Sequence, residues 1–307
     1  MEDRFITGEQ EVRDLDFAIN EERRQFAKFF KKFKLYNLIL MIGILVIITL
    51  SVVLLFPLGE VGMGLALGII IAVLVGVIVY SKIMKNYTNK RGNKYMAFYY
   101  KSVSDFVFKN LKISDYNQDV ANQLTFEDFS NAKILKDIST TGSRNLVTYN
   151  YHDLSVKVAD YASYQVKAKQ NSIVFVGKLI VVEGIKPFKE RLLIYRRPSA
   201  QALKEAVGPN DLEGLNLIVE DNDLLIYAEG ETSKNPLNKK AMEALKNFPQ
   251  EMPFVDMTLS FIGTKLTIAI SYSDDLMVIP LPEPFKAEPT DVLRRNIKAI
   301  HDFLDLI

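Results

Sequence analysis

The stretch that decides the fold runs from Leu35 to Tyr80 and reads LYNLILMIGILVIITLSVVLLF, then PLGE, then VGMGLALGIIIAVLVGVIVY. The first run, 35–56, and the last, 61–80, contain no charged residue. At 22 and 20 residues, each matches the ~20 residues that an α-helix needs to cross a bilayer core. The four residues Pro57–Glu60 leave room only for a tight turn. The stretch therefore predicts a helical hairpin that spans a membrane twice.

The first run carries most of this prediction. Seventeen of its 22 residues are Leu, Ile, Val, Met or Phe, and at ~0.3–0.6 kcal/mol each they favour insertion by roughly 5–10 kcal/mol. Glycines dilute the second run, but the short turn ties it to the first. A buried core helix is disfavoured because two adjacent uncharged runs are rare in soluble folds. A cleaved signal peptide fits poorly because 34 residues rich in acids and bases precede the first run.

Basic residues gather at one end of this hairpin, and we call them the basic collar. No acid lies between Glu22 and the first run, none lies between the second run and Asp105, and the turn has no base. Because positive residues stay cytoplasmic, we expect an inner or plasma membrane protein with both termini in the cytoplasm. The collar, which Lys101 continues, consists of Arg23, Arg24, Lys28, Lys31, Lys32, Lys34, Lys82, Lys85, Lys90, Arg91 and Lys94.

The collar has two interpretations. It either sets topology alone, which is the simpler interpretation, or it also recognises anionic lipid headgroups. The net charge of +1 conceals it, because residues 102–307 hold 24 bases against 28 acids. That mildly acidic balance argues against nucleic-acid binding.

Small residues recur at every fourth position of the second run, a spacing that predicts close helix packing. We expect the partner to be 35–56 of the same chain, because the short turn holds the two runs together. A channel of oligomerised two-span subunits is the alternative, but apart from Thr49 and Ser51 the runs offer almost no polar side chain to line a pore. The small residues are Gly64, Gly68, Ala72 and Gly76.

Apolar stripes with alternating spacings of three and four flank the hairpin on both sides. We expect them to pack on each other as a short helical stalk, with a partner's helix as the alternative. The poor helix formers in Asn86–Asn89 and Gly92–Asn93 predict a helix break before Tyr95. The stripes are Val12, Leu15, Ile19, Glu22, Phe26, Phe29 and Phe33, and then Met96, Tyr100, Val103, Val107 and Leu111.

The rest of the chain mixes strand and helix patterns, which predicts an α+β domain built on antiparallel sheet. Most strands alternate, as half-exposed antiparallel strands do. Hairpins are predicted at 147–151 with 154–158 around His152–Asp153, at 215–219 with 224–228, and at 257–261 with 266–272 around Gly263–Thr264. Further strands are predicted at 173–182 and 192–195, and helices at 199–207, at 237–248 and from Thr290, as N-cap, to Ile307.

The predicted organisation has four parts. They are a cytoplasmic amphipathic helix at 1–34, the transmembrane hairpin at 35–80, the collar and connecting helix at 81–112, and the cytoplasmic α+β domain at 113–307.

Few residues suggest chemistry. The chain has no cysteine, which excludes disulfides and thiolate sites, and neither His152 nor His301 has a second ligand at metal spacing. We interpret them as a solvated turn histidine and a helix-edge histidine, with no metal and no cofactor. Arg196 could hold a phosphate but reads more simply as a solvated strand end. The acid pairs Asp221 with Asp223 and Asp274 with Asp275 lie in predicted turns.

Several segments resemble a bacterial two-span membrane family, domain of unknown function 3137. The resemblance implies no catalytic residue and no cofactor, and it makes a LemA-type membrane protein a possible partner. A departure at Thr141–Arg144 leaves the register of the first hairpin open. The matching segments are Ile113–Tyr116, where a helix ends, Phe126–Leu135, Val174–Leu179, Lys186–Lys189, Asp223–Tyr227, Leu259–Phe261 and Lys265–Ile270.

Two functional hypotheses remain open at this point. The first is a membrane-anchored cytoplasmic interaction or sensor module without a recognisable catalytic site. The second is a membrane-bound enzyme, such as a carboxylate-based hydrolase, whose residues converge only in the fold. A deep pocket that holds several carboxylates or Arg196 would favour the second hypothesis.

Overall fold

The computed structural model describes residues 2–109, 111, 113, 116–119, 124–135, 139–167, 170–196, 212–221, 223–230, 235–251, 254–273 and 284–307. The chain is α+β, with a long apolar helical region first, then an antiparallel sheet and a C-terminal helix. It forms two compact units. One is the helical hairpin Phe17–Tyr99, and the other is a domain built mainly from Tyr100 onward, together with the N-terminal end of the first helix.

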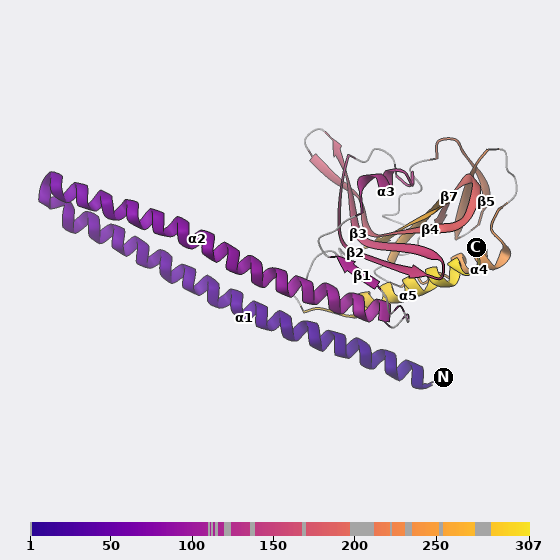
Figure 1. The fold of residues 1–307 in the computed structure, drawn as a ribbon, viewed down its shortest axis with the longest axis horizontal. Helices are drawn as coiled ribbons and strands as arrows, with labels where there is room; N and C mark the ends of the chain where they lie inside the picture. The colour runs from indigo at the N-terminus through magenta and orange to yellow at the C-terminus, as the bar shows by residue number, and fades with distance from the viewer. Residues whose placement is uncertain are drawn as a thin grey trace. The chain divides into compact units, whose positions relative to one another are not determined.

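The hairpin consists of α1 (Glu2–Leu55) and α2 (Gly59–Ser104), joined by the 3₁₀ turn η1 (Phe56–Leu58). This confirms the predicted tight turn, and Figure 1 shows the two helices side by side. Phe26 of the first stripe stacks on Tyr95 with ring centroids 5.1 Å apart, so the helices that flank the two apolar runs contact each other. Tyr95 precedes the second stripe, so the packing of the two stripes themselves stays a prediction. The helix break expected at residues 86–93 is wrong. The packing of α2 against α1 outweighs the weak propensity of those residues.

The domain is a seven-stranded sheet in which every described pairing is antiparallel, in the order β1-β2-β3-β4-β6-β5, with β7 paired to β4. The predicted hairpins 147–158 and 215–228 are confirmed. The strands are β1 (Tyr116–Asp119), β2 (Thr140–Tyr151), β3 (Leu154–Lys167), β4 (Gln170–Arg196), β5 (Leu215–Glu220), β6 (Leu224–Glu229) and β7 (Phe254–Tyr272).

Two long strands, β4 and β7, organise this sheet and correct the sequence prediction. The segments 173–182 and 192–195 are one 27-residue strand, β4, and the predicted hairpin around Gly263 is the single strand β7. Gly184 and Gly263 have φ values of +97° and +60°, a region that glycine enters at little cost. The β4–β7 pairing is irregular around them, so these glycines bend a continuous ribbon instead of ending its strands.

Helices cover both faces of the sheet. On one face Phe129 of α3 (Phe126–Ser130) stacks on Tyr161, and on the other Phe303 of α5 (Glu288–Leu304) meets Phe261 (Figure 1). The central strands are therefore buried on both sides, and the half-exposed pattern expected for 257–272 is wrong. The predicted helix 237–248 is confirmed as α4 (Lys239–Lys246), whereas 199–207 lies outside the described residues.

Two helix ends differ from the prediction. Helix α2 ends at Ser104 and continues only as the π-helical turn η2 (Asp105–Lys109), so the helix expected to reach Tyr116 is wrong. Tyr116 instead begins β1. Thr290 lies inside α5, whose N-cap is Ala287 with no side-chain cap, because Pro289 sits in the first turn and needs no N–H partner.

Candidate functional sites

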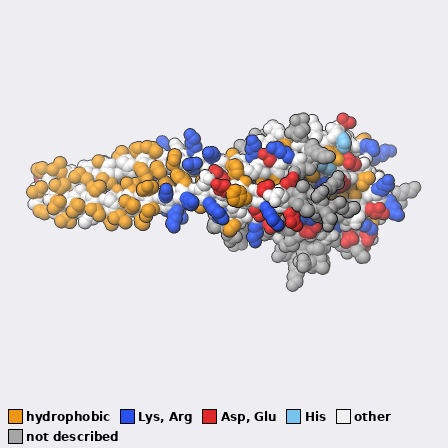
Figure 2. Space-filling view, turned by 90° about the horizontal axis from the view of Figure 1, so that it is seen from below, with side chains coloured by type: hydrophobic (Ala, Val, Ile, Leu, Met, Phe, Trp, Pro, Cys, Tyr) orange, Lys and Arg blue, Asp and Glu red, His pale blue; other side chains and the backbone are white. Residues whose placement is uncertain are grey.

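The hairpin exposes an unusual amount of apolar surface. Only 6% of its most apolar 18-residue window is buried, whereas the core helix of a soluble protein buries most of its apolar face. The region is long and apolar enough to cross a membrane. Figure 2 shows its apolar side chains as a continuous band with Lys and Arg side chains at one end.

The contact between α1 and α2 includes a pair of polar side chains. The Tyr80 hydroxyl donates to Asn37 Oδ1 across the hairpin at 3.1 Å. The hydroxyls of Thr49 and Ser51 donate to carbonyls of their own helix, those of Leu45 and Ile47. Because these hydroxyls are satisfied within α1, they give no support to a water-filled pore.

The small-residue stripe does not pack as expected. Gly64, Gly68, Ala72 and Gly76 are all exposed, and a Cβ added at any of the three glycines would meet nothing within 4 Å. The predicted packing of this stripe against residues 35–56 of the same chain is therefore wrong. Within 61–80 the buried small residues are Gly62 and Ala66, each two positions before a residue of the stripe.

The domain contains a pocket of about 430 Å³ beside the bend of β4. Lys186, Lys189 and Arg191 line it together with apolar side chains such as Leu237 and Ile307. Glu190 is its only carboxylate side chain among the described residues. Lys186 Nζ donates to the Ile307 carbonyl at 2.9 Å, which ties the wall to the chain end. The pocket holds neither converging carboxylates nor Arg196, so it gives no support to the hydrolase hypothesis.

Arg196 has a structural position. Its side chain is fully buried, and Nε and Nη2 donate to the carbonyls of Leu245 and Lys246 at 2.8 and 2.7 Å. The guanidinium thus satisfies the last carbonyls of α4. Burial lowers the pKa of Arg196, and the charge of Asp223 opposes this effect. The interpretation of Arg196 as a solvated strand end is wrong, because its donors stabilise a helix end.

The two histidines come together at the β2–β3 turn and the end of α5. His152 is 71% exposed and lies 3.3 Å from Asp305 Oδ1, which confirms the solvated turn histidine. His301 is only 5% exposed, so the helix-edge interpretation is wrong for it. Its ring stacks on Tyr151 at 4.1 Å. No group of three His, Cys, Asp or Glu that could hold a metal occurs within the part of the chain that the structure describes.

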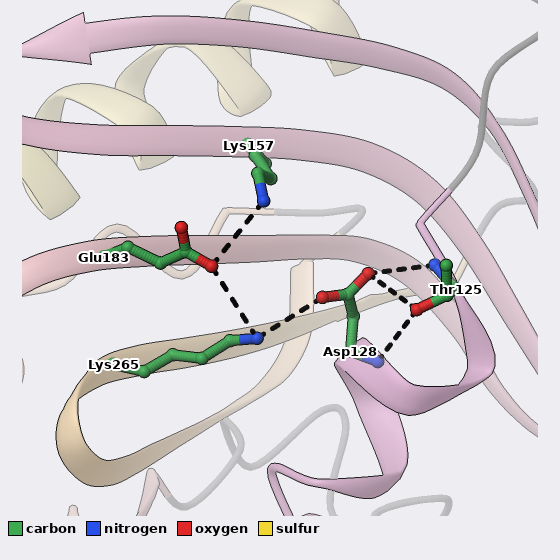
Figure 3. Close-up of polar contacts among 5 residues, drawn as sticks. All are labelled: Thr125, Asp128, Lys157, Glu183 and Lys265. Carbon is green, nitrogen blue, oxygen red and sulfur yellow. Dashed lines mark hydrogen bonds and ion pairs between the residues drawn. The ribbon is translucent and has the colours of Figure 1, made fainter.

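A surface network links α3 to three strands (Figure 3). Lys265 Nζ lies 3.3 Å from Asp128 Oδ1 and 3.9 Å from Glu183 Oε1, and Lys157 lies 3.5 Å from the same Glu183 oxygen. Burial raises the pKa of Asp128, but hydrogen bonds from Thr125 and Lys265 outweigh burial and hold it below its ordinary value. Two cations and two carboxylates balance each other, so the network fixes α3 on the sheet. The capping box Thr125-x-x-Asp128 was the missed sequence signal for α3.

Sequence reasoning also missed a buried polar cluster. Lys178 and Asp160 form an ion pair whose side chains are 7% and 1% exposed. Asn145 Nδ2 donates to Asp160 at 3.5 Å, and Gln118 donates to Asn145 at 2.6 Å and to Ser104 Oγ at 2.9 Å. The cluster therefore ties the end of α2 to the centre of the sheet. A charged residue beside Gly177 in an apolar run was its one signal.

Of the predicted acid pairs, Asp221 forms an ion pair with Lys246 at the end of α4. Asp223 raises the pKa of the same lysine, although the hydrogen bond from Lys246 to Asp221 is the largest cause. Asp274 and Asp275 lie outside the described residues.

Comparison with known proteins gives one distant likeness. No protein family and no curated protein sequence matches the chain. One solved structure aligns with the chain at a distance, the crystal structure of the mycobacterial trehalose monomycolate transport factor A, with 10% identity and a TM-score of 0.37. The alignment covers 68% of this chain and 96% of that one. A likeness this distant carries no conclusion about function, and membership of family 3137 stays a prediction.

Proposed function

We propose that the protein is a membrane-anchored cytoplasmic interaction module. The observation that supports this proposal is the exposed apolar surface of the hairpin, bordered by bases at one end only. In water, that surface would drive aggregation, whereas in a bilayer it favours insertion. The collar then holds both termini on the cytoplasmic side of the inner or plasma membrane.

Within the domain, the pocket beside β4 is the surface we propose for an interaction. Its exposed bases are Lys186 and Lys189 against the single acid Glu190, which favours an acidic ligand, and its apolar walls favour one with an apolar part. The family resemblance makes a LemA-type membrane protein the first partner to test.

The anchor is tested by introducing single cysteines into this cysteine-free chain. We expect an impermeant thiol reagent to label Leu58→Cys in intact cells and to leave Glu11→Cys and Lys298→Cys unlabelled until the cells are opened. Labelling of Lys298→Cys in intact cells would contradict the proposed orientation. Release of the protein from membranes by alkaline carbonate would contradict the proposed membrane anchor.

The interaction is tested by immunoprecipitating the full chain and its Leu237→Trp variant, which fills the pocket. Loss of a LemA-type partner from the variant but not from Leu217→Trp, on the exposed edge strand β5, would support the pocket. Equal recovery with both variants would place the interaction elsewhere.

A further inference from the structure

A second hollow lies in the hairpin unit itself. It is a groove of about 420 Å³ between α1 and α2, lined at one end by Ile44 and Val77 and at the other by Lys85 and Thr88. Phe33 lies at the second end, eleven positions before Ile44, which corresponds to about 16 Å along a helix. The groove therefore extends from the apolar band to the basic collar.

The polarity of the groove changes along its length. Its inner end offers only apolar side chains, and its middle contains the Tyr80–Asn37 hydrogen bond at 3.1 Å. Its outer end is lined by the basic residue Lys85, while the Thr88 hydroxyl already donates to the carbonyls of Met84 and Lys85. A ligand that fits this gradient has an apolar chain and an anionic head.

Charge complementarity favours an anionic headgroup at the outer end of the groove. The hairpin contains no carboxylate between Glu22 and Glu60 or between Glu60 and Asp105, so nothing near Lys85 in sequence neutralises it. The other collar bases add a positive field at the same end. Basic pockets between membrane helices on the cytoplasmic side suit anionic lipid heads.

We infer that this groove binds one anionic phospholipid, with an acyl chain along Ile44 and Val77 and the headgroup phosphate at Lys85. The inference rests on the proposed membrane anchor and goes beyond it by assigning a lipid site. Among the collar bases, Lys85 lines the groove, whereas the others meet the headgroup region outside it.

Native mass spectrometry of the full chain in detergent tests this site, with phosphatidylglycerol and phosphatidylcholine added in turn. We expect one phosphatidylglycerol to be retained in preference to phosphatidylcholine. Lys85→Gln should weaken its retention about fivefold, since one base near an anionic surface contributes roughly that factor. Lys82→Gln, which removes an exposed base outside the groove, should change retention less than twofold. Ile44→Trp should reduce retention by filling the apolar end.

Three results would overturn the inference. They are equal retention of the two lipids, equal loss in Lys85→Gln and Lys82→Gln, and displacement of the lipid by inorganic phosphate alone. The last result would indicate a phosphate site without an acyl chain. Carbonate extraction of the same variants separates the two proposals. A protein that stays in the membrane without lipid preference contradicts only the lipid site, and a protein released by carbonate contradicts the anchor.

Discussion

The Tyr149 hydroxyl and the His301 Nε2 atom lie 2.9 Å apart, although the two residues are 152 positions apart in the chain. The contact joins β2 to the end of α5. Burial lowers the pKa of His301 to about 4, and the charges of Asp305 and Asp302 only partly oppose this effect. The domain therefore keeps this histidine neutral where an unfolded chain would protonate it.

This burial predicts a pH dependence of stability. The unfolded chain takes up the His301 proton near pH 6.5, and the folded chain takes it up only near pH 4. As the pH falls through that window, the unfolded state binds more protons, so stability is lost, by roughly 3 kcal/mol at most. We expect urea unfolding of the full chain in detergent, followed by tyrosine fluorescence, to show a smaller free energy at pH 4.5 than at pH 7.5.

Two matched histidine variants show which side chain causes this loss of stability. His301→Gln should reduce the difference between the two pH values, whereas the exposed His152→Gln should keep it. An unchanged difference in His301→Gln would mean that other groups carry the dependence.

The close backbone approach at Gly177 predicts that a single added methyl group destabilises the domain strongly. A Cβ at this position would lie 1.9 Å from the carbonyl oxygen of Ile270 on β7, so the β4–β7 pairing would have to separate locally. Gly177→Ala should therefore destabilise the domain by roughly 2–3 kcal/mol. Gly142→Ala is the control, because its Cβ would meet nothing within 4 Å. Equal urea midpoints for the two variants would contradict the close approach.

Two glycines of α2 give a matched test of the hairpin. A Cβ at Gly62 would lie 1.8 Å from the Leu55 carbonyl oxygen, and one at Gly68 would meet nothing within 4 Å. We expect Gly62→Ala to lower the melting temperature in detergent and Gly68→Ala to leave it unchanged or raise it, since Ala favours helix. A lower melting temperature for Gly68→Ala than for Gly62→Ala would indicate instead that the stripe containing Gly68 is the face that packs within the chain.

The same stripe is open to a second molecule. If Gly68→Ile converts a dimer into a monomer on size exclusion in detergent, the exposed stripe is an interface between copies. Unchanged size at normal abundance would leave it facing lipid.

The parts of the fold that local patterns control were predictable. The turn before Gly59 and the His152–Asp153 hairpin follow from chain length and alternation, which act over a few residues. The bends at Gly184 and Gly263 were mistaken for strand ends, because a positive-φ glycine looks the same in a turn and in a bent strand. Only pairing with a distant strand distinguishes the two cases.

The sites were harder to predict for the same reason. His301 looked peripheral because its cover, Tyr149 and Tyr151, comes from another part of the chain. The groove beside Lys85 requires the register of α1 against α2, which the apolar runs do not specify. The collar itself was visible because it depends only on composition near the runs.

The buried pair of Asp160 and Lys178 predicts a strong non-additivity. Asp160→Asn leaves the Lys178 ammonium buried without its partner charge, and Lys178→Met leaves the Asp160 carboxylate in the same state. Each single change should cost roughly 3–5 kcal/mol. The double variant removes both charges, so it should cost clearly less than the sum of the single changes. A double-mutant cycle from urea unfolding of the full chain measures this coupling, and additive costs would show that the two charges are not paired in solution.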